Sequence, residues 1–291
     1  MSNTGNILAS IKYFYYRKHL GKWVAFIVAL AFVIILFSPM VWMVRISLTA
    51  KPDLFVLPPK SIIGNINLDG YRTLLEMTNF LRYYLNSIIV AFSTVGVCLV
   101  AGMLAAYSFS RFKYRGRKIL MMLALSAQMF PWALLLISVY IFYIKFHLLD
   151  TYIGLVLAHT TFALPLTIWI VKSYFDTIPK ELEESAFIDG CGRMKTLQSI
   201  IVPVSSPGIL AASIYVFIFS WNDFIFGLTL TTKDHMRILA PGIAISFIGE
   251  FEYAWVEMMS SCIAVSIPIV IMFLFLQKYF IEGLTAGALK E

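Results

Sequence analysis

The chain has 291 residues, of which 60% are hydrophobic and only 13% are charged, and its net charge is +7. Soluble domains are about half apolar and a quarter charged, so this composition excludes an ordinary soluble domain and is typical of a helical protein with several membrane spans. The three cysteines, Cys98, Cys191 and Cys262, lie too far apart along the chain to suggest a disulfide framework or a zinc site.

Six apolar stretches are long enough to cross about 30 Å of hydrocarbon as helices. We predict spans at residues 23–44, 84–109, 119–144, 151–171, 207–227 and 259–277. The first follows a basic lead and is too long for the apolar region of a signal peptide, so we expect it to be retained. Pro131, Pro165 and Pro268 fall inside spans, where neighbouring helices satisfy the freed carbonyl groups. The predicted fold class is an all-α polytopic membrane protein, with one transmembrane domain over residues 1–291.

The basic residues indicate how the spans are oriented. Most of the 23 Lys and Arg residues fall on one side of the membrane when the N-terminus is placed in the cytoplasm. The short loop 110–118 carries most of this weight, because it holds Arg111, Lys113, Arg115, Arg117 and Lys118. Positive charge concentrates in cytoplasmic loops, so both termini and residues 172–206 are predicted to be cytoplasmic. Topology thereby explains the basic surplus, which argues against nucleic-acid binding.

A polar block of residues 172–206 separates the fourth and fifth predicted spans. We expect it to begin with an acidic helix that starts at Asp176 or Thr177, because short polar side chains cap the first turn of helices. The same helix is expected to stop at Gly190 or Gly192, since glycine readily takes the left-handed conformation that ends a helix.

A second helix is predicted to follow, with one apolar stripe of Met194, Leu197, Ile201 and Val204. Pro203 and Pro207 are then expected to kink the chain as it enters the membrane. The block is either an ordinary connecting loop or a docking surface. Its length and its amphipathic helices favour docking, because most loops have only a handful of residues.

Catalytic groups are missing from the sequence of this block. It has no histidine and no pair of nucleophile and base, and its segment Gly190–Thr196 lacks the glycine that precedes the lysine of a phosphate loop. We therefore predict that the chain is not an enzyme and carries no cofactor or metal of its own.

The block resembles a known signature. Permease subunits of bacterial ABC importers share a cytoplasmic motif of E-A-A, three residues, G, nine residues and then I-x-L-P. On that spacing this chain has Glu184-Ser185-Ala186, Gly190 and Ile200-Ile201-Val202-Pro203. Ser185 stands in place of the first alanine and Val202 in place of the leucine, and both replacements are close in size.

The resemblance extends along nearly the whole chain. Segments such as "SLTAKP" from Ser47, "SWNDF" from Ser220 and "GLTAGALK" from Gly283 are similar to carbohydrate-importer permeases of the maltose type, specifically to the smaller permease subunit. This resemblance implies the type I ABC importer permease fold, in which a coupling helix between spans four and five sits in a cleft of a separate ATPase subunit. That subunit would bind the ATP and Mg.

The resemblance assigns coupling to the ATPase to Glu184, Ser185, Ala186, Asp189, Gly190, Leu197, Ile201 and Pro203. Leu197 and Ile201 can pack either into the ATPase cleft or against the chain's own spans. The implied partners are an ABC ATPase dimer, an extracytoplasmic solute-binding protein, membrane lipid and a carbohydrate substrate, all at a bacterial inner membrane.

Charge is scarce inside the predicted spans. Asp223 either lines the sugar path or reaches interfacial water, and His159 is either a ligand or, as we favour, a buried and hydrogen-bonded side chain. Sugars offer apolar ring faces and hydroxyl groups, which suit aromatic and amide side chains. The candidate path residues are therefore Gln128, Trp132, Tyr140, Trp221, Asn222 and Asp223, although aromatic side chains also populate interfacial belts.

Other classes fit the sequence less well. A secondary transporter would usually show more spans, internal repeats and several buried carboxylates, and a membrane enzyme would need convergent catalytic groups. The predicted function is thus the permease subunit of an ATP-driven carbohydrate importer, with a secondary transporter or another polytopic membrane protein as the alternative. Six spans are too few to enclose a wide sugar path, so we expect a heterodimer with a related permease. The sequence leaves a homodimer open and does not name the sugar.

Overall fold

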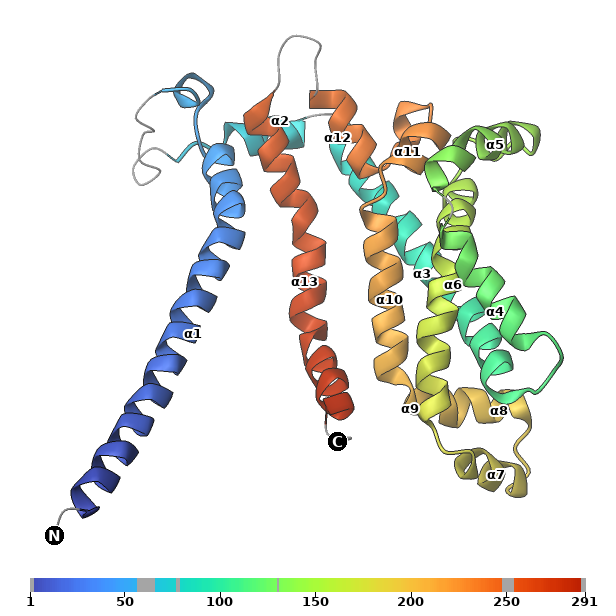
Figure 1. Cartoon of the computed structure of the whole chain (residues 1–291). Helices are drawn as coiled ribbons and strands as arrows, with labels where there is room; N and C mark the ends of the chain where they lie inside the picture. The colour runs from blue at the N-terminus through green and yellow to red at the C-terminus, as the bar shows by residue number, and fades with distance from the viewer. Residues whose placement is uncertain (1–2, 57–65, 77–78, 130, 248–253, 289–291) are drawn as a thin grey trace. The chain divides into compact units, whose positions relative to one another are not determined.

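The computed structural model describes residues 3–56, 66–76, 79–129, 131–247 and 254–288, and places side chains in these ranges except at 3–21, 132–133 and 278–288. The described residues form α-helices joined by short turns (Figure 1). The α-helices are α1 (Asn3–Ser47), α2 (Asp69–Glu76), α3 (Phe80–Arg111), α4 (Arg117–Ser126), α5 (Trp132–Lys145), α6 (Tyr152–Thr177), α7 (Glu181–Ile188), α8 (Arg193–Thr196), α9 (Val202–Val204), α10 (Ser206–Trp221), α11 (Ile225–Leu230), α12 (Leu239–Phe247) and α13 (Trp255–Ala288).

Shorter helical turns connect some of these elements. They are the 3₁₀ turns η1 (Lys51–Asp53), η2 (Ala127–Met129) and η4 (Asp234–Met236) and the π-helical turn η3 (Leu197–Ile201).

The described residues contain four to six candidate membrane spans, against the six that the sequence predicts. Among the described residues, α1, α3, α6 and α13 are each long and apolar enough to cross a membrane, and the number reaches six if each of two bent helix pairs is counted as one span. The bent pairs are α4 with α5, and the segment Arg193–Val204 with α10. Most described side chains of α1 are exposed in the isolated chain and few of those of α13 are buried, as expected where lipid or another subunit takes the place of water.

The chain divides into two compact units by its internal contacts. The smaller unit contains residues 1–71 and 255–263, and the larger contains residues 72–254 and 264–291, so that α13 runs from one unit into the other. Within the smaller unit, Ser47 hydrogen-bonds Tyr71 at 3.0 Å and Lys51 pairs with the buried Glu257. The prediction of one transmembrane domain stays a prediction.

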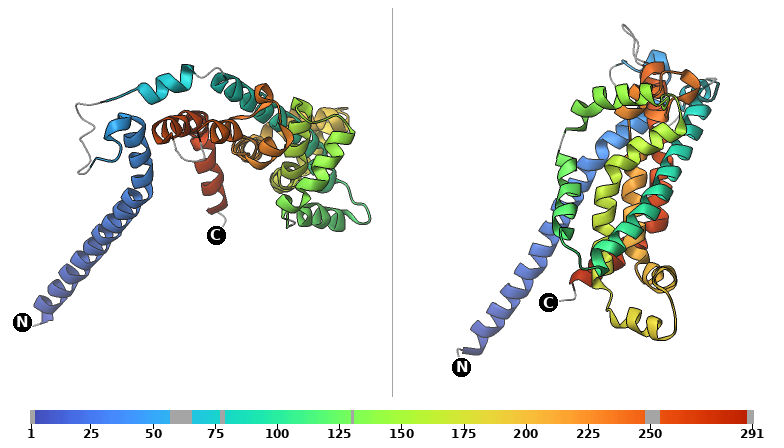
Figure 2. Two further views of the ribbon diagram at one scale, coloured as in Figure 1. Left: turned by 90° about the horizontal axis from the view of Figure 1, so that it is seen from above. Right: turned by 90° about the vertical axis from the view of Figure 1, so that its right-hand side faces the viewer.

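The core of the larger unit lies among α3, α6 and α10 (Figures 1 and 2). Small side chains sit at its centre, where Cys98 and Ala163 have no exposed surface. On α10 a Cβ added to Gly208 would lie 2.1 Å from the Tyr174 ring of α6, so only glycine lets the two helices approach this closely. Membrane helices commonly pack through such small residues, because van der Waals contact replaces the hydrophobic effect inside a bilayer.

The third predicted span, residues 119–144, is not one straight helix. The chain bends by 101° between Arg117–Met129 and Leu134–Lys145. Pro131 stands at the N-cap of α5 rather than inside a helix. Proline has no N–H to donate and suits the start of a helix better than its middle, which explains why the span breaks here. Pro165 and Pro268 lie inside α6 and α13 as predicted.

The fourth and fifth predicted spans also need correction at their ends. The fourth, predicted as 151–171, continues in α6 to Thr177. The fifth, predicted as 207–227, ends its helix at Trp221, and after a three-residue break α11 begins at Ile225. The predicted kink before the fifth span is confirmed, since the chain bends by 82° between Val204 and Ser206.

Candidate functional site

The polar block folds as two short helices at one end of α6 and α10, while α5 and α11 lie at the other end of these helices (Figures 1 and 2). The predicted stop of the acidic helix is confirmed: Gly190 has a φ of +81°. Its N–H donates to the carbonyl of Phe187 at 3.1 Å, and the N–H of Cys191 donates to the carbonyl of Ala186 at 2.9 Å. This pair of bonds is a Schellman motif, which only a residue at ease with positive φ completes without strain.

The predicted start of the acidic helix is wrong. Asp176 and Thr177 are the last residues of α6, and α7 begins only at Glu181, after the short connection 178–180. Asp176 instead accepts a hydrogen bond from Ser110 at 2.6 Å and pairs with Lys172. Its carboxylate therefore fastens the end of α6 to the end of α3, rather than capping α7.

A buried ion pair holds α7 against α3. The Arg111 guanidinium, at the last residue of α3, pairs with Glu183, and the two side chains are only 9% and 6% exposed. Tyr107 donates a second hydrogen bond to Glu183 at 3.0 Å, and Arg111 also donates to the carbonyl of Ile178 at 3.2 Å. Because the remaining donors and acceptors of both charges find partners, this pair fixes the position of α7 without leaving a buried charge unsatisfied.

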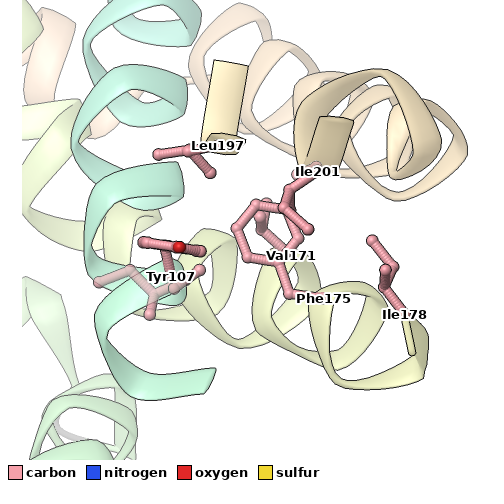
Figure 3. Close-up of a cluster of buried hydrophobic side chains, with 9 residues drawn as sticks. Tyr107, Val171, Phe175, Ile178, Leu197 and Ile201 are labelled. Atoms are coloured by element: carbon pink, nitrogen blue, oxygen red, sulfur yellow. The ribbon is translucent and has the colours of Figure 1, made fainter. Parts of the chain in front are cut away.

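An apolar cluster fixes the second half of the block. Leu197 and Ile201 are 3% and 0% exposed. They point toward Tyr107, Val171 and Phe175 (Figure 3). We expect from the sequence that Leu197 and Ile201 pack either into the ATPase cleft or against the chain's own spans. In the structure they pack against the chain's own spans.

The predicted apolar stripe is only half buried, since Met194 and Val204 are 55% and 54% exposed. For Val204 the reason is the π-helical turn η3, over Leu197–Ile201, which precedes it. A π turn accommodates an extra residue and rotates the positions that follow it, so the α-helical spacing no longer places Val204 on the face of Leu197 and Ile201. Met194 lies before the turn, in α8, and the turn does not explain its exposure.

The remaining side chains of α7 form an exposed surface. We define the α7 outer face as Leu182, Glu184, Ser185, Phe187, Ile188 and Asp189, all of which are exposed. Its apolar members are conspicuous: Ile188 is 86% exposed, Leu182 44% and Phe187 41%. Of the residues to which coupling was assigned, Glu184, Ser185, Asp189, Gly190 and Pro203 are exposed, whereas Ala186, Leu197 and Ile201 are buried.

The candidate path residues are not all brought together. Trp221 is 2% exposed, and its indole N–H donates to the carbonyl of Val265 at 3.1 Å, so it serves packing. Gln128 donates to the carbonyl of Phe162 at 3.1 Å, and Tyr140 packs beside the cluster around Tyr143. The Trp132 side chain lies outside the described residues.

Asn222 and Asp223 do share a cavity. Its volume is about 450 Å³, and half of its lining residues are aromatic. The lining residues are Tyr215, Ile218, Phe219, Asn222, Asp223 and Phe226. Asn222 is exposed and supplies an amide edge, which together with the aromatic wall gives the cavity the chemistry that suits a sugar.

Asp223 has a second role in the structure. Its carboxylate accepts from the backbone N–H groups of Phe226 and Gly227, at 3.3 and 2.8 Å, and thereby satisfies the first turn of α11. It also lies 3.3 Å from Nε2 of His159, a ring that is fully buried and bonded through Nδ1 to Ser220 at 2.7 Å. The favoured interpretation of His159 as a buried, hydrogen-bonded side chain is confirmed.

Comparison with known proteins decides the family. A model of the family described as "binding-protein-dependent transport system inner membrane component" matches residues 98–285. This chain belongs to that family. It is 37% identical over 264 residues to the trehalose/maltose transport system permease protein MalG of Thermococcus litoralis, covering 90% of this chain and 94% of the relative.

Other relatives agree with this assignment. The permease is 35% identical to the trehalose transport system permease protein SugB of Mycobacterium tuberculosis, over 87% of this chain and 92% of that protein. Its fold matches a chain in the crystal structure of a bacterial ABC transporter involved in the import of the acidic polysaccharide alginate. The TM-score is 0.73 at 18% identity, and the match covers 96% of this chain and 99% of the other. The predicted type I ABC importer permease fold is thus confirmed.

Two residues that position the site were not predicted for that role. In the sequence Arg111 counts as a topology signal, and Glu183 is only one of the acids of the predicted acidic helix. They stand 72 residues apart in the sequence, and no spacing rule connects them. The exposed apolar side chains of the permease's α7 were missed for another reason, because a helix of eight residues shows too little periodicity to reveal which side is covered.

We expect the Asp223→Ala variant of the permease to be less stable by about 1–3 kcal/mol, since it loses the cap of α11 and the anion beside His159. Thermal unfolding of the detergent-purified protein measures this. The neighbouring Asn222→Ala variant is the matched control, because Asn222 is exposed and should leave the unfolding temperature unchanged. Equal unfolding temperatures for both variants would contradict a capping role for Asp223.

Proposed function

We propose that this permease is one half of the translocation path of an ATP-driven ABC importer for a carbohydrate. The names of its relatives support the substrate class, since they are permeases for trehalose and maltose. The observation that carries the coupling role is the α7 outer face, where apolar and acidic side chains stay exposed on a helix that a buried ion pair holds rigidly. An exposed apolar patch rimmed by polar residues is typical of a protein–protein contact.

The proposed partner of the α7 outer face is a separate ABC ATPase subunit, which binds ATP and Mg. Glu184 is placed to pair with a basic side chain of that subunit, and Ile188 to fill an apolar part of its cleft. Since α7 is tied to α3 through Glu183 and Arg111, a displacement of α7 carries the end of α3 with it. The path then opens alternately to the two sides as ATP binding favours one of the two states.

The path itself needs a second permease. We propose a heterodimer with a related subunit, an extracytoplasmic binding protein that delivers the carbohydrate, and both termini in the cytoplasm. The aromatic cavity beside Asn222 would then line the path, with its amide facing sugar hydroxyls. Asp223 would shape this cavity through α11 rather than bind the sugar directly, because its carboxylate oxygens already have partners within the chain.

Reversing the charge of Glu184 tests the coupling role. We expect Glu184→Lys to insert and fold normally, because the side chain is exposed. Uptake of labelled trehalose or maltose per ATP hydrolysed, in vesicles with the partner subunits, should fall at least about tenfold, which corresponds to the loss of about 1.4 kcal/mol at the contact.

Glu181→Lys is the matched control for this experiment. It makes the same charge change in the first turn of the same helix, so it reproduces the effect on the helix dipole without touching the signature position. Normal uptake by the Glu184→Lys transporter, or an equal loss in both variants, would refute a specific contact at Glu184.

A further inference from the structure

The loop between α3 and α4 concentrates positive charge, and the sequences of α3 and α4 on either side of it contain no Asp or Glu. Lys113, Arg115, Arg117 and Lys118 fall within six residues, and the sequence from there to the end of α4 contains no Asp or Glu. Lys113, Arg115 and Lys118 are exposed, and within the described part of the chain none of them has an ion-pair partner. The surface therefore carries uncompensated charge that an anion can neutralise.

These cations surround a hollow. An open cavity of about 550 Å³ is lined by the four basic side chains together with Tyr114 and Ile119. Arg117 is held in place by its hydrogen bond to the carbonyl of Phe112 at 3.1 Å. The hollow is wide enough for a phosphate diester with its polar substituent, and the cations around it are the groups that bind one.

An apolar stripe starts at the edge of this hollow. Ile119 both lines the cavity and begins a face of α4 that continues with Met122 and Leu123, at i, i+3 and i+4. These three side chains are 62%, 65% and 60% exposed. Cations at one end and apolar side chains along the adjoining helix match the headgroup and the acyl chains of a lipid.

We propose that the hollow at residues 113–119 binds the headgroup of an anionic phospholipid, with an acyl chain along Ile119, Met122 and Leu123. This proposal rests on the membrane location given under the proposed function. An acidic protein or a nucleic acid would use the cations but not the apolar stripe, whereas a phospholipid uses both.

The lipid site adjoins the coupling block. The guanidinium of Arg193, in α8, lies 4.7 Å from the centre of the Phe112 ring, and Phe112 also accepts the hydrogen bond from Arg117. A bound anionic headgroup therefore contacts a loop whose first residue packs on α8. The lipid would stabilise this arrangement of the loop against the block.

Native mass spectrometry of the intact transporter tests the proposal. The complex is supplied with equal amounts of phosphatidylglycerol and phosphatidylcholine, and the retained lipids are counted. We compare wild type with Lys113→Gln/Arg115→Gln, and with the control Arg82→Gln/Lys145→Gln, which removes one exposed Lys and one exposed Arg elsewhere. Wild type and the control should both retain more phosphatidylglycerol than phosphatidylcholine. In the loop variant this preference should fall about five- to twentyfold, because each basic residue near an anionic surface contributes roughly a factor of five to the binding.

Three results would overturn the assignment. The first is retention of both lipids in equal amounts by wild type, and the second is an equal loss of preference in both double variants. The third is complete displacement of phosphatidylglycerol by inorganic phosphate, which would make the hollow a simple anion site. The measurement counts bound lipid and not sugar uptake, so a failure here is distinct from a failure of the proposed transport function.

Discussion

We expect the Arg111→Ala variant to lose about 3–5 kcal/mol of stability and most of its transport, because the Glu183 carboxylate would remain buried without its cation. In this variant the hydrogen bond from Tyr107 to Glu183 would remain, but one hydrogen bond cannot offset the loss of the positive charge. Water or a proton would have to reach the carboxylate, and either change loosens α7 from α3. Thermal unfolding of the purified protein and uptake in vesicles measure the two effects.

Two controls distinguish the effect of breaking the buried ion pair from the effect of removing any charged side chain. Lys172→Ala removes one partner of the more exposed pair with Asp176, whose side chains are 25% and 43% exposed, and should cost less than about 1 kcal/mol. The double variant Arg111→Met/Glu183→Met removes both buried charges, so it should regain much of the stability that Arg111→Ala loses. If Arg111→Ala unfolds at the wild-type temperature, the ion pair does not hold α7 in place.

The sequence predicts where the apolar helices lie, because their formation depends on a local property. A stretch of about twenty apolar residues has to be a helix in hydrocarbon, whatever its neighbours are. The coupling block is likewise found from its polar composition and the spacing of Glu184, Gly190 and Pro203. Gly190 illustrates the point, because a helix stop depends on the residue's own conformational range, and the positive φ is what that range predicts.

The details that sequence reasoning missed depend on tertiary contacts. Pro131 and the break after Trp221 interrupt predicted spans that are apolar on both sides of the interruption, so length and composition alone do not locate these breaks. The exposure of Val204, when Leu197 and Ile201 are buried, follows from a π turn that changes the helical period. Glu183 is buried and Glu184 is exposed, but the two residues look alike in the sequence. Only the position of Arg111 in the fold distinguishes them.

We expect the Ile188→Asp variant to weaken association with the ATPase subunit by about ten- to a hundredfold, while the permease itself stays stable. Ile188 is 86% exposed in this chain, so its replacement costs almost nothing in folding. Burying an isoleucine at an interface contributes about 1.5–3 kcal/mol, and an aspartate in the same cleft would in addition lose its hydration. Co-elution of the purified permease complex with the ATPase, titrated over concentration, measures the change in affinity.

Comparing Ile188→Asp with Arg111→Ala separates the two roles of α7, which are packing within the permease and contact with the ATPase. Ile188→Val keeps an apolar side chain of nearly the same shape and should bind the ATPase almost as wild type does, which controls for the substitution itself. Arg111→Ala should lower both the unfolding temperature and the affinity, whereas Ile188→Asp should lower the affinity alone. Wild-type affinity in Ile188→Asp would mean that the ATPase docks elsewhere. A lower unfolding temperature in that variant would mean that Ile188 packs within the permease, and in both cases the α7 outer face would not be the coupling surface.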